Sequence, residues 1–279
     1  MTTCASIIIP AHNEAHYIEN CLLGLLGSDG SVGKVEIIVV ANGCRDDTAN
    51  IAKGMQQDFA ARGWQLRVIE TRVGNKPNAL NIGDAGAVSD NRIYVDADVT
   101  VSPKLIAQIV QVLDRPGPLY VSGTPVVTAP RRGISRPYAR FWAGLPFVTE
   151  GVPGFGIFAV NQAGRARWDE FPKVISDDTF VRLNFAPRER VQVTASYNWP
   201  IVHGFGKLVR VRRRQDIGVQ EISAKFPGLV QNGRPTKLGL RGLFRHLVRD
   251  PVGFVAYGFV SVAVRLPILK SKNSWARGR

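Results

Sequence analysis

Two aspartates stand one residue apart directly after a short apolar run. The run at residues 93–95 is typical of a buried strand, and Asp96 and Asp98 follow it. Because residues two apart in an extended chain point to the same side, we expect the two carboxylates to converge where the strand ends. Such hard oxygen ligands suit Mg²⁺ or Mn²⁺ carrying a phosphorylated ligand. A solvated loop with two acidic residues would give the same short pattern, so the neighbouring segments must decide between a metal site and such a loop.

Apolar strands and amphipathic helices alternate along the first part of the chain. Strands are predicted at residues 6–10, 35–40 and 66–69, before the strand at 93–95. Helices are predicted from residue 18, over about 49–60, from about 74 and over about 103–113. This alternation predicts an α/β fold with a doubly wound, mostly parallel sheet flanked by helices. Ligands of such sheets bind at the carboxyl edge of the strands.

The second part of the chain is less regular. A strand is predicted at 120–127, near a sheet edge because it contains Pro125, and another at 155–160. Between them, residues 131–156 are rich in glycine and proline and are predicted to form a long irregular segment, which is often functional. Trp142 and Phe147 in this segment are either sugar-stacking groups or core aromatics. A helix is predicted over about 179–185.

The net charge of +14 is unevenly distributed, with −3 on residues 1–130 and +17 on residues 131–279. This asymmetry indicates an anionic partner for the second part: a nucleic acid, a phospholipid or a phosphorylated substrate. No nucleic-acid partner is expected, because aromatic residues do not interleave with the basic clusters and no recognised binding motif is present. Three cysteines without metal-like spacing, and no recognisable signal peptide, favour a reducing, cytoplasmic location.

Five motifs occur in an order that resembles family 2 glycosyltransferases with the GT-A fold. They are Ile-Ile-Ile-Pro-Ala-His-Asn-Glu (7–14), Ile-Ile-Val-Val-Ala-Asn-Gly-Cys-Arg-Asp-Asp-Thr (37–48), Gly-Asn-Lys-Pro-Asn-Ala-Leu-Asn (74–81), Asp-Ala-Asp (96–98) and Ser-Asp-Asp (176–178). Each motif is weak alone, and together they cover roughly residues 5–215. The resemblance implies transfer of a sugar from a nucleotide-diphosphate donor, with Mn²⁺ or Mg²⁺ and inversion at the anomeric carbon.

The resemblance also implies a donor site. Asn42 stands where the family usually has the second Asp of an Asp-Asp-Gly-Ser turn that contacts the base, and Ala41 replaces the first. An Asn carbonyl can still accept a hydrogen bond from a uracil or guanine N–H. Asp96 would face the ribose or the metal, and Asp98 would bind the metal directly. Other positions implied to contact the donor are Pro10, Asn13 and Glu14 around the nucleotide, and Lys76 near the ribose and diphosphate.

Asp177 and Asp178 stand where the family has an acidic pair whose second member is the catalytic base. Asp178 is therefore the candidate that takes the proton of the acceptor hydroxyl. After Ser176, the pair could also serve as the negatively charged start of a helix, and the two roles are compatible. His203 matches a histidine that some members use as a further metal ligand, although an isolated His beside apolar residues is more often a core residue.

The basic segment 207–215 falls where the family carries residues that close over the diphosphate. Arg210 and Arg213 could hold phosphate oxygens with their guanidinium groups, or the segment could be a solvated basic face. The Gln-x-x-Arg-Trp motif of processive synthases is absent, which favours addition of a single sugar. The expected acceptor is a hydroxyl of a lipid-linked molecule or glycan, in cell-envelope or exopolysaccharide synthesis.

The chain becomes basic and amphipathic from residue 239. Residues 234–279 hold ten Lys and Arg against one acid, Asp250. The apolar run at 252–264 would make about 20 Å of helix, against roughly 30 Å for a membrane core. We therefore expect a glycosyltransferase domain at 1–238, with a donor-binding part (1–130) and an acceptor-binding part (131–238), and a segment at 239–279 that docks on the anionic inner face of the cell membrane. The alternative is a helix packed on the catalytic domain with a solvated basic fringe.

Two other functions fit parts of the sequence. A nucleotidyltransferase acting on a sugar phosphate also pairs an α/β sheet with acidic metal ligands. It would ordinarily have a Gly-rich loop bearing Lys or Arg after the first strand, and residues 10–14 offer none. The other is a basic nucleic-acid-binding module without catalysis, which the +17 part suggests and the missing binding motifs disfavour.

Overall fold

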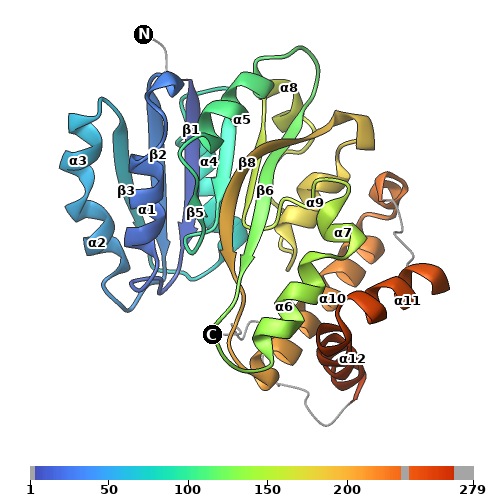
Figure 1. The fold of residues 1–279 in the computed structure, drawn as a ribbon. Helices are drawn as coiled ribbons and strands as arrows, with labels where there is room; N and C mark the ends of the chain where they lie inside the picture. Colours follow the sequence, from blue (N-terminus) through green and yellow to red (C-terminus); the bar gives the residue numbers. More distant parts are fainter. Residues whose placement is uncertain (1–3, 234–238, 267–279) are drawn as a thin grey trace.

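The computed structural model describes residues 4–233 and 239–266 (Figure 1). Within these residues, one eight-stranded sheet has the order β3-β2-β1-β4-β7-β6-β8-β5. Its strands are β1 (Ala5–Ala11), β2 (Val35–Asn42), β3 (Gln65–Thr71), β4 (Arg92–Val95), β5 (Thr100–Val101), β6 (Tyr120–Thr128), β7 (Ile157–Val160) and β8 (Arg190–Pro200). Pairs β1–β2, β1–β4, β2–β3 and β6–β8 are parallel, and β7 and β5 pair antiparallel to their neighbours. The predicted α/β class with a mostly parallel sheet is confirmed.

Helices cover both faces of this sheet. They are α1 (Ile18–Leu26), α2 (Thr48–Gly54), α3 (Gln56–Ala61), α4 (Lys76–Ala85), α5 (Leu105–Leu113), α6 (Ser135–Ala143), α7 (Pro146–Thr149), α8 (Gln162–Arg165), α9 (Asp177–Leu183), α10 (Phe205–Lys225), α11 (Leu240–Arg249) and α12 (Pro251–Arg265). In β1, Ile7 and Ile9 face the core that contains α1 and α5, whereas Ile8 faces the core that contains Leu80 of α4. Because both faces are covered, β1 and β2 are buried along their whole length and consist mostly of apolar residues, with Ser6 and Glu36 as a hydrogen-bonded buried pair.

Three features of the second part differ from the sequence prediction. The predicted irregular segment 131–156 contains α6 and α7. Strand β8 was not predicted, although Val193 and Tyr197 provide buried residues for one of its faces. Strand β6 lies inside the sheet, between β7 and β8, and not near an edge. Pro125 is tolerated there because β6 pairs with β7 only at Tyr120 and Val121, before the proline.

The C-terminal helix α12 packs against α6 and α10 at one end of the molecule (Figure 1). Its Ala256, Val260 and Ala263 share a hydrophobic core with Tyr138 of α6 and Leu208 of α10. Helix α12 is therefore packed on the rest of the chain, as in the alternative reading of a packed helix, and residues 267–279 of the predicted segment lie outside the described residues. No single described helix has the length and apolar character needed to cross a membrane. The two helical segments Gly242–Arg249 and Pro251–Arg265, which are bent by 119° relative to each other, would together be long and apolar enough, judged by length and composition only.

Candidate functional site

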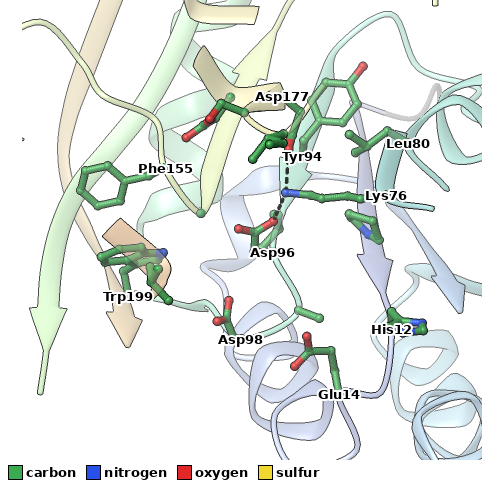
Figure 2. A pocket seen from close by; sticks show the side chains of 18 of the residues that line it. His12, Glu14, Lys76, Leu80, Tyr94, Asp96, Asp98, Phe155, Asp177 and Trp199 are labelled. Carbon is green, nitrogen blue, oxygen red and sulfur yellow. Dashed lines mark hydrogen bonds and ion pairs between the residues drawn. The ribbon is translucent and has the colours of Figure 1, made fainter. Parts of the chain in front are cut away.

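A cavity of about 430 Å³ opens at the carboxyl edge of β1, β2 and β4 (Figure 2). The donor-side motifs and the second part of the chain both line it, so it lies between the two predicted parts. Eight of the predicted site residues line this cavity: Pro10, Glu14, Asn42, Lys76, Asp96, Asp98, Asp177 and Asp178. Four others, Asn13, His203, Arg210 and Arg213, are not among the residues that line it.

Lys76 joins the acidic groups of the cavity. It is the first residue of α4, which begins there because the Asn75 side chain accepts a hydrogen bond from the N–H of Asn78 and Pro77 fits the first turn. The Lys76 Nζ lies 2.8 Å from Asp96 Oδ1 and 3.1 Å from Asp177 Oδ1 (Figure 2). Burial would lower the pKa of the Lys76 ammonium, but the carboxylates of Asp177 and Asp96 raise it above its usual value. Lys76 is therefore a fixed cation at the centre of the site.

Asp178 has the chemistry of a general base. Burial, together with the neighbouring charge of Asp177, raises the pKa of its carboxyl to about 6, and Lys76 opposes this rise. Its Oδ1 accepts a hydrogen bond of 2.7 Å from the N–H of Thr179 at the start of α9. Ser176 precedes the helix but its side chain makes no capping hydrogen bond. A carboxylate with a pKa near 6 is a good proton acceptor at neutral pH.

Helix α10 holds the acidic pair in place. A Cβ added at Gly218 would overlap the Oγ of Ser176 and lie 3.2 Å from the Cβ of Ile175, so only glycine allows α10 to approach this closely. One turn later, the carboxylate of Glu221 accepts a hydrogen bond of 2.8 Å from the N–H of Ile175. The turn before α9 is thus held by α10 at Ile175 and Ser176. Neither residue was singled out by the sequence analysis.

Asp96 and Asp98 are the candidate metal ligands. The N–H of Asp96 donates to the carbonyl of Gly156 at 2.8 Å, and the Asp96 carbonyl accepts from the N–H of Val99 at 3.0 Å, which forms a tight turn at the end of β4. Among the described residues, no group of three His, Cys, Asp or Glu side chains is placed to hold a metal ion. Two carboxylates in an open cavity fit a cation that takes its other ligands from a diphosphate and from water. His203 is exposed and does not line the cavity.

The end of the cavity where the sequence predicts the nucleotide is built from the loops after β1 and β2. The ring of His12 lines the cavity, and its Nδ1 lies 2.5 Å from the carbonyl oxygen of Asn42. Because that oxygen can only accept, Nδ1 carries the hydrogen. The side-chain amide of Asn42 is buried and donates to the carbonyl of Ala11 at 2.7 Å. His12 stands inside the first motif, and this position was the only sequence signal for it.

Asn13 has a supporting role in these loops. Its backbone adopts the left-handed region with φ of 55°, which is uncommon for a residue other than glycine. Its side-chain oxygen accepts a hydrogen bond of 2.7 Å from the N–H of Arg45. Nearby, the N–H of Glu14 donates to the Oγ1 of Thr48 at 2.8 Å. These bonds join the loop after β1 to the loop after β2, so that Asn13 braces the nucleotide end from outside the cavity.

The basic residues of α10 are divided between two sides of the helix. Arg213 donates to the backbone carbonyls of Ala263, Val264 and Leu266, at 2.9–3.2 Å, and so caps the end of α12. Arg210 is exposed and lies outside the cavity lining. Val211, Arg214 and Gln215 line the cavity instead, with the spacing of one helix face. Arg214 is the cationic residue of α10 that stands where Arg210 and Arg213 were expected.

Aromatic side chains form one wall of the cavity. Phe155 and Trp199 line it, with ring centroids 4.7 Å apart, and Figure 2 shows both on the side of Asp96 opposite Lys76. Trp142 is a buried core residue stacked behind Trp199 at 5.3 Å, and Phe147 is 40 % exposed and contacts Trp142. Of the two readings of Trp142, the structure supports the core. Trp199, which the sequence analysis did not single out, takes the position expected for a stacking residue.

The family model for glycosyl transferase family 2 matches residues 6–212, which is most of the chain. The chain belongs to this family. Among curated relatives, the uncharacterized glycosyltransferase EpsJ of Bacillus subtilis is 32% identical over 111 residues, which covers 40% of this chain and 30% of the relative. The glycosyltransferase AglE of Haloferax volcanii is 27% identical over 130 residues, with 47% and 42% covered. This family 2 chain therefore spans less than half the length of the curated relatives that it matches.

Solved structures of similar fold cover nearly the whole family 2 chain. The mannosyltransferase PcManGT from Pyrobaculum calidifontis, in complex with GDP-Man and Mn²⁺, has a TM-score of 0.61 at 19% identity and covers 96% of this chain and 77% of its own. Residues 1–349 of TarS from S. aureus, in complex with UDP-GlcNAc, have a TM-score of 0.56 at 16% identity, with 95% and 82% covered. At these identities the likeness establishes the fold, and the expected GT-A architecture is confirmed.

Proposed function

We propose that this protein transfers a single sugar from a nucleoside-diphosphate sugar to an acceptor hydroxyl, with a divalent metal and inversion of the anomeric carbon. The observation that carries the proposal is the convergence of Asp96, Asp98 and Asp178 on one cavity, with Lys76 between them. The carboxylates of Asp96 and Asp98 suit a metal–diphosphate, and the carboxyl of Asp178, whose pKa is raised to about 6, suits a base. Family membership supports the same reaction class.

The donor would lie along the loops after β1, β2 and β4. His12, Asn42 and Gly74 line the end that would take the nucleoside, while Asp96 and Asp98 would hold Mn²⁺ or Mg²⁺. When bound there, the cation offsets the charge that develops on the leaving diphosphate. Lys76 and Arg214, from α4 and α10, supply fixed positive charge in the same cavity. The solved complexes of PcManGT with GDP-Man and Mn²⁺ and of TarS with UDP-GlcNAc support this type of donor.

Asp178 would act on the acceptor. As the acceptor oxygen forms its bond to the anomeric carbon, the bond from that carbon to the diphosphate oxygen breaks. The hydroxyl proton passes to a carboxylate oxygen of Asp178, and the nucleoside diphosphate leaves. Attack from the face opposite the leaving group inverts the anomeric carbon. Asp177, which is buried and paired with Lys76, would hold the geometry of the pair and not accept the proton.

The acceptor would enter along the aromatic wall. Phe155 and Trp199 offer stacking surfaces, and Ile201 and Val202 extend the wall with apolar side chains. This lining suits a sugar ring or the apolar part of a lipid carrier. We therefore propose a lipid-linked or glycan acceptor, in cell-envelope or exopolysaccharide synthesis at the cytoplasmic side of the membrane. The reaction would add one sugar per acceptor.

A thermal-shift screen of nucleoside diphosphates, with and without Mn²⁺, tests the donor assignment. We expect one of UDP, GDP, ADP or CDP to stabilise the protein only with the metal, by about 2.7 kcal/mol at a hundredfold excess over its dissociation constant. The matching sugar donor should then be consumed with release of the nucleoside diphosphate. Release of pyrophosphate from a nucleoside triphosphate and a sugar phosphate would instead identify a nucleotidyltransferase. If no nucleotide stabilises the protein, the proposal fails.

A further inference from the structure

Large exposed hydrophobic side chains concentrate at the C-terminal end of the described chain. Nine of the nineteen exposed large hydrophobic residues among the described residues lie between positions 243 and 266. They are Leu243, Phe244, Leu247 and Val248 in α11, Val252, Val255, Phe259 and Val262 in α12, and Leu266 after it. We call these nine side chains the C-terminal apolar surface. A concentration of this kind marks an interaction site more often than chance exposure.

Helix α11 is amphipathic in the manner of an interfacial helix. Leu243 and Leu247, with Phe244 and Val248, form one apolar stripe at helical spacing, and all four are exposed. By the same spacing, Arg245 and Arg249 lie outside this stripe, beyond its Val248 edge, and are also exposed. A separate side of the helix, at His246, contacts the ring of Phe141 at 5.4 Å. The apolar stripe of α11 is therefore directed away from the protein.

Helix α12 presents a second apolar face beside the one that it buries. Its Ala256, Val260 and Ala263 pack into the core with α6 and α10. Its Val252, Val255, Phe259 and Val262 are 53–65 % exposed and share an adjacent stripe. Figure 1 shows α11 and α12 together at the margin of the molecule, beyond α6 and α10. The packed face fixes α12, so that only its outer face is available to a partner.

The angle between α11 and α12 is fixed by an ion pair at the bend. Asp250 accepts hydrogen bonds of 2.8 Å and 2.5 Å from the guanidinium of Arg140 in α6. The same carboxylate caps α12 by accepting from the N–H of Gly253 at 2.9 Å. A Cβ at Gly253 would lie 2.9 Å from the Cβ of Phe141, so α12 sits close against α6. The two helices therefore form a preformed surface and not a straight span.

We propose that the C-terminal apolar surface docks on an anionic lipid bilayer, with the stripe of α11 and the outer face of α12 buried at the headgroup boundary. The positive charge of this part of the chain favours an anionic bilayer over a second copy of the chain as the partner. Residues 234–279 carry ten Lys and Arg and one acid, and that acid, Asp250, is already bound by Arg140. A second copy would bring like charges together, whereas anionic lipid complements them. Arg245 and Arg249 lie where they can reach phosphate groups beside the buried stripe.

This docking would hold the active-site cavity close to the membrane surface. Helix α10 connects the two, because Arg213 binds the last carbonyls of α12 while the next residue, Arg214, lines the cavity. A lipid-linked acceptor would then reach the cavity without leaving the bilayer. This last step rests on the proposed function, whereas the docking itself rests only on α11 and α12.

Vesicle co-sedimentation of the full chain tests the docking. We expect binding to vesicles of phosphatidylglycerol and phosphatidylcholine in equal parts, and much weaker binding to phosphatidylcholine alone. The double variant Val248→Ser/Val262→Ser should weaken binding by at least about tenfold, because two exposed apolar side chains no longer enter the bilayer. The matched control is Val73→Ser/Val88→Ser, whose valines are similarly exposed elsewhere (66 % and 69 %, against 66 % and 60 %). The control should bind like wild type.

Two double variants, each of which removes two arginine charges, test the electrostatic contribution to vesicle binding. Arg245→Gln/Arg249→Gln should weaken binding to the anionic vesicles by about fivefold or more per arginine at moderate salt. Arg72→Gln/Arg188→Gln removes the same charge from exposed positions elsewhere and should have little effect. Equal binding of the test and control variants, or no vesicle binding by wild type, would overturn the proposal. So would a wild-type dimer that Val248→Ser/Val262→Ser converts to monomer, because a second copy would then be the occupant. Nucleotide-dependent thermal shifts on the same samples report the proposed function separately.

Discussion

Lys76 at the start of α4 and Asp177 at the start of α9 form an ion pair of 3.1 Å between Nζ and Oδ1. The pair connects the donor side of the cavity to the acidic pair that contains the candidate base. Asp177 is nearly fully buried, so its carboxylate depends on this cation for compensation. Through Asp96, the same ammonium also contacts the turn that carries the candidate metal ligands. One side chain therefore contacts both the turn with the proposed metal ligands and the acidic pair with the proposed base.

Replacing Lys76 with methionine should move the pH dependence of transfer upward. Lys76 lowers the pKa of the Asp178 carboxyl, so its loss lets burial and the Asp177 charge raise that pKa above about 6. The acid limb of the kcat profile at saturating donor should shift to higher pH, and the free energy of unfolding should fall by about 1–3 kcal/mol. Lys53→Met, which removes a lysine from an exposed ion pair, should leave both the acid limb and the free energy of unfolding close to wild type. An unshifted limb in Lys76→Met would show that Asp178 is not the titrating base.

Asp178→Asn should abolish transfer and leave the fold intact. The amide keeps the shape of the side chain but cannot accept a proton, so transfer should fall by at least about a hundredfold while nucleotide affinity stays near wild type. In the wild type, kcat/KM should decline below about pH 6, because the carboxyl is then protonated.

Stability gives a second measurement on the same variant. A carboxyl whose folded-state pKa is raised above its unfolded value favours folding when protonated, and this contribution is lost as pH rises through about 6. Asp178→Asn should therefore be at least as stable as wild type at pH 8 in chemical denaturation. If Asp177→Asn is inactive and Asp178→Asn is active, the base has been assigned to the wrong member of the pair.

Asp98→Ala should remove metal-dependent nucleotide binding. Asp98 follows β4 and lines the cavity, outside the buried core, so its truncation should not unfold the protein. Titration of the nucleoside diphosphate should give equal, weak affinity with and without Mn²⁺ in the variant, against a clear metal dependence in wild type. Asp90→Ala, at an exposed position before β4, is the control. Retained Mn²⁺ dependence in Asp98→Ala would remove the metal assignment.

Gly218→Ala should damage the site although alanine is the better helix former. By helix propensity alone the substitution would stabilise α10 by about 1 kcal/mol. The new Cβ would overlap Ser176, so we expect a loss of about 1–3 kcal/mol in unfolding free energy and lower transfer. At Gly206, near the start of the same helix, a Cβ meets nothing within 4 Å, and alanine should be neutral or slightly stabilising. Equal effects of the two substitutions would contradict the close approach of α10 to the acidic pair.

The sequence by itself determined the local part of the site. Asp96 and Asp98 follow the end of β4 and both line the cavity, as predicted, but they do so from a tight turn and not from the extended chain on which the prediction relied. The alternation of apolar strands and amphipathic helices was enough to predict the α/β sheet and its ligand-binding edge, because both depend on local periodicity and on the parallel sheet alone. The resemblance carried by the five motifs, and not local conformation, implied that Asn42, Lys76 and Asp178 belong to one site, and all three line the cavity.

Tertiary packing decided the rest. Arg210, Arg213 and Arg214 look equivalent in the basic segment, and only the docking of α10 turns Arg214 to the cavity and Arg213 to the end of α12. Composition likewise could not decide that Trp199 lines the cavity whereas Trp142 is buried behind it. The pattern of residues 252–264 predicts an apolar helix but does not show which of its sides is buried. The buried side is set by packing against α6, more than a hundred residues earlier in the chain, and against α10, some forty residues earlier. A sequence specifies the periodicity of a helix, whereas its rotation about its own axis is set by the surfaces that it packs against.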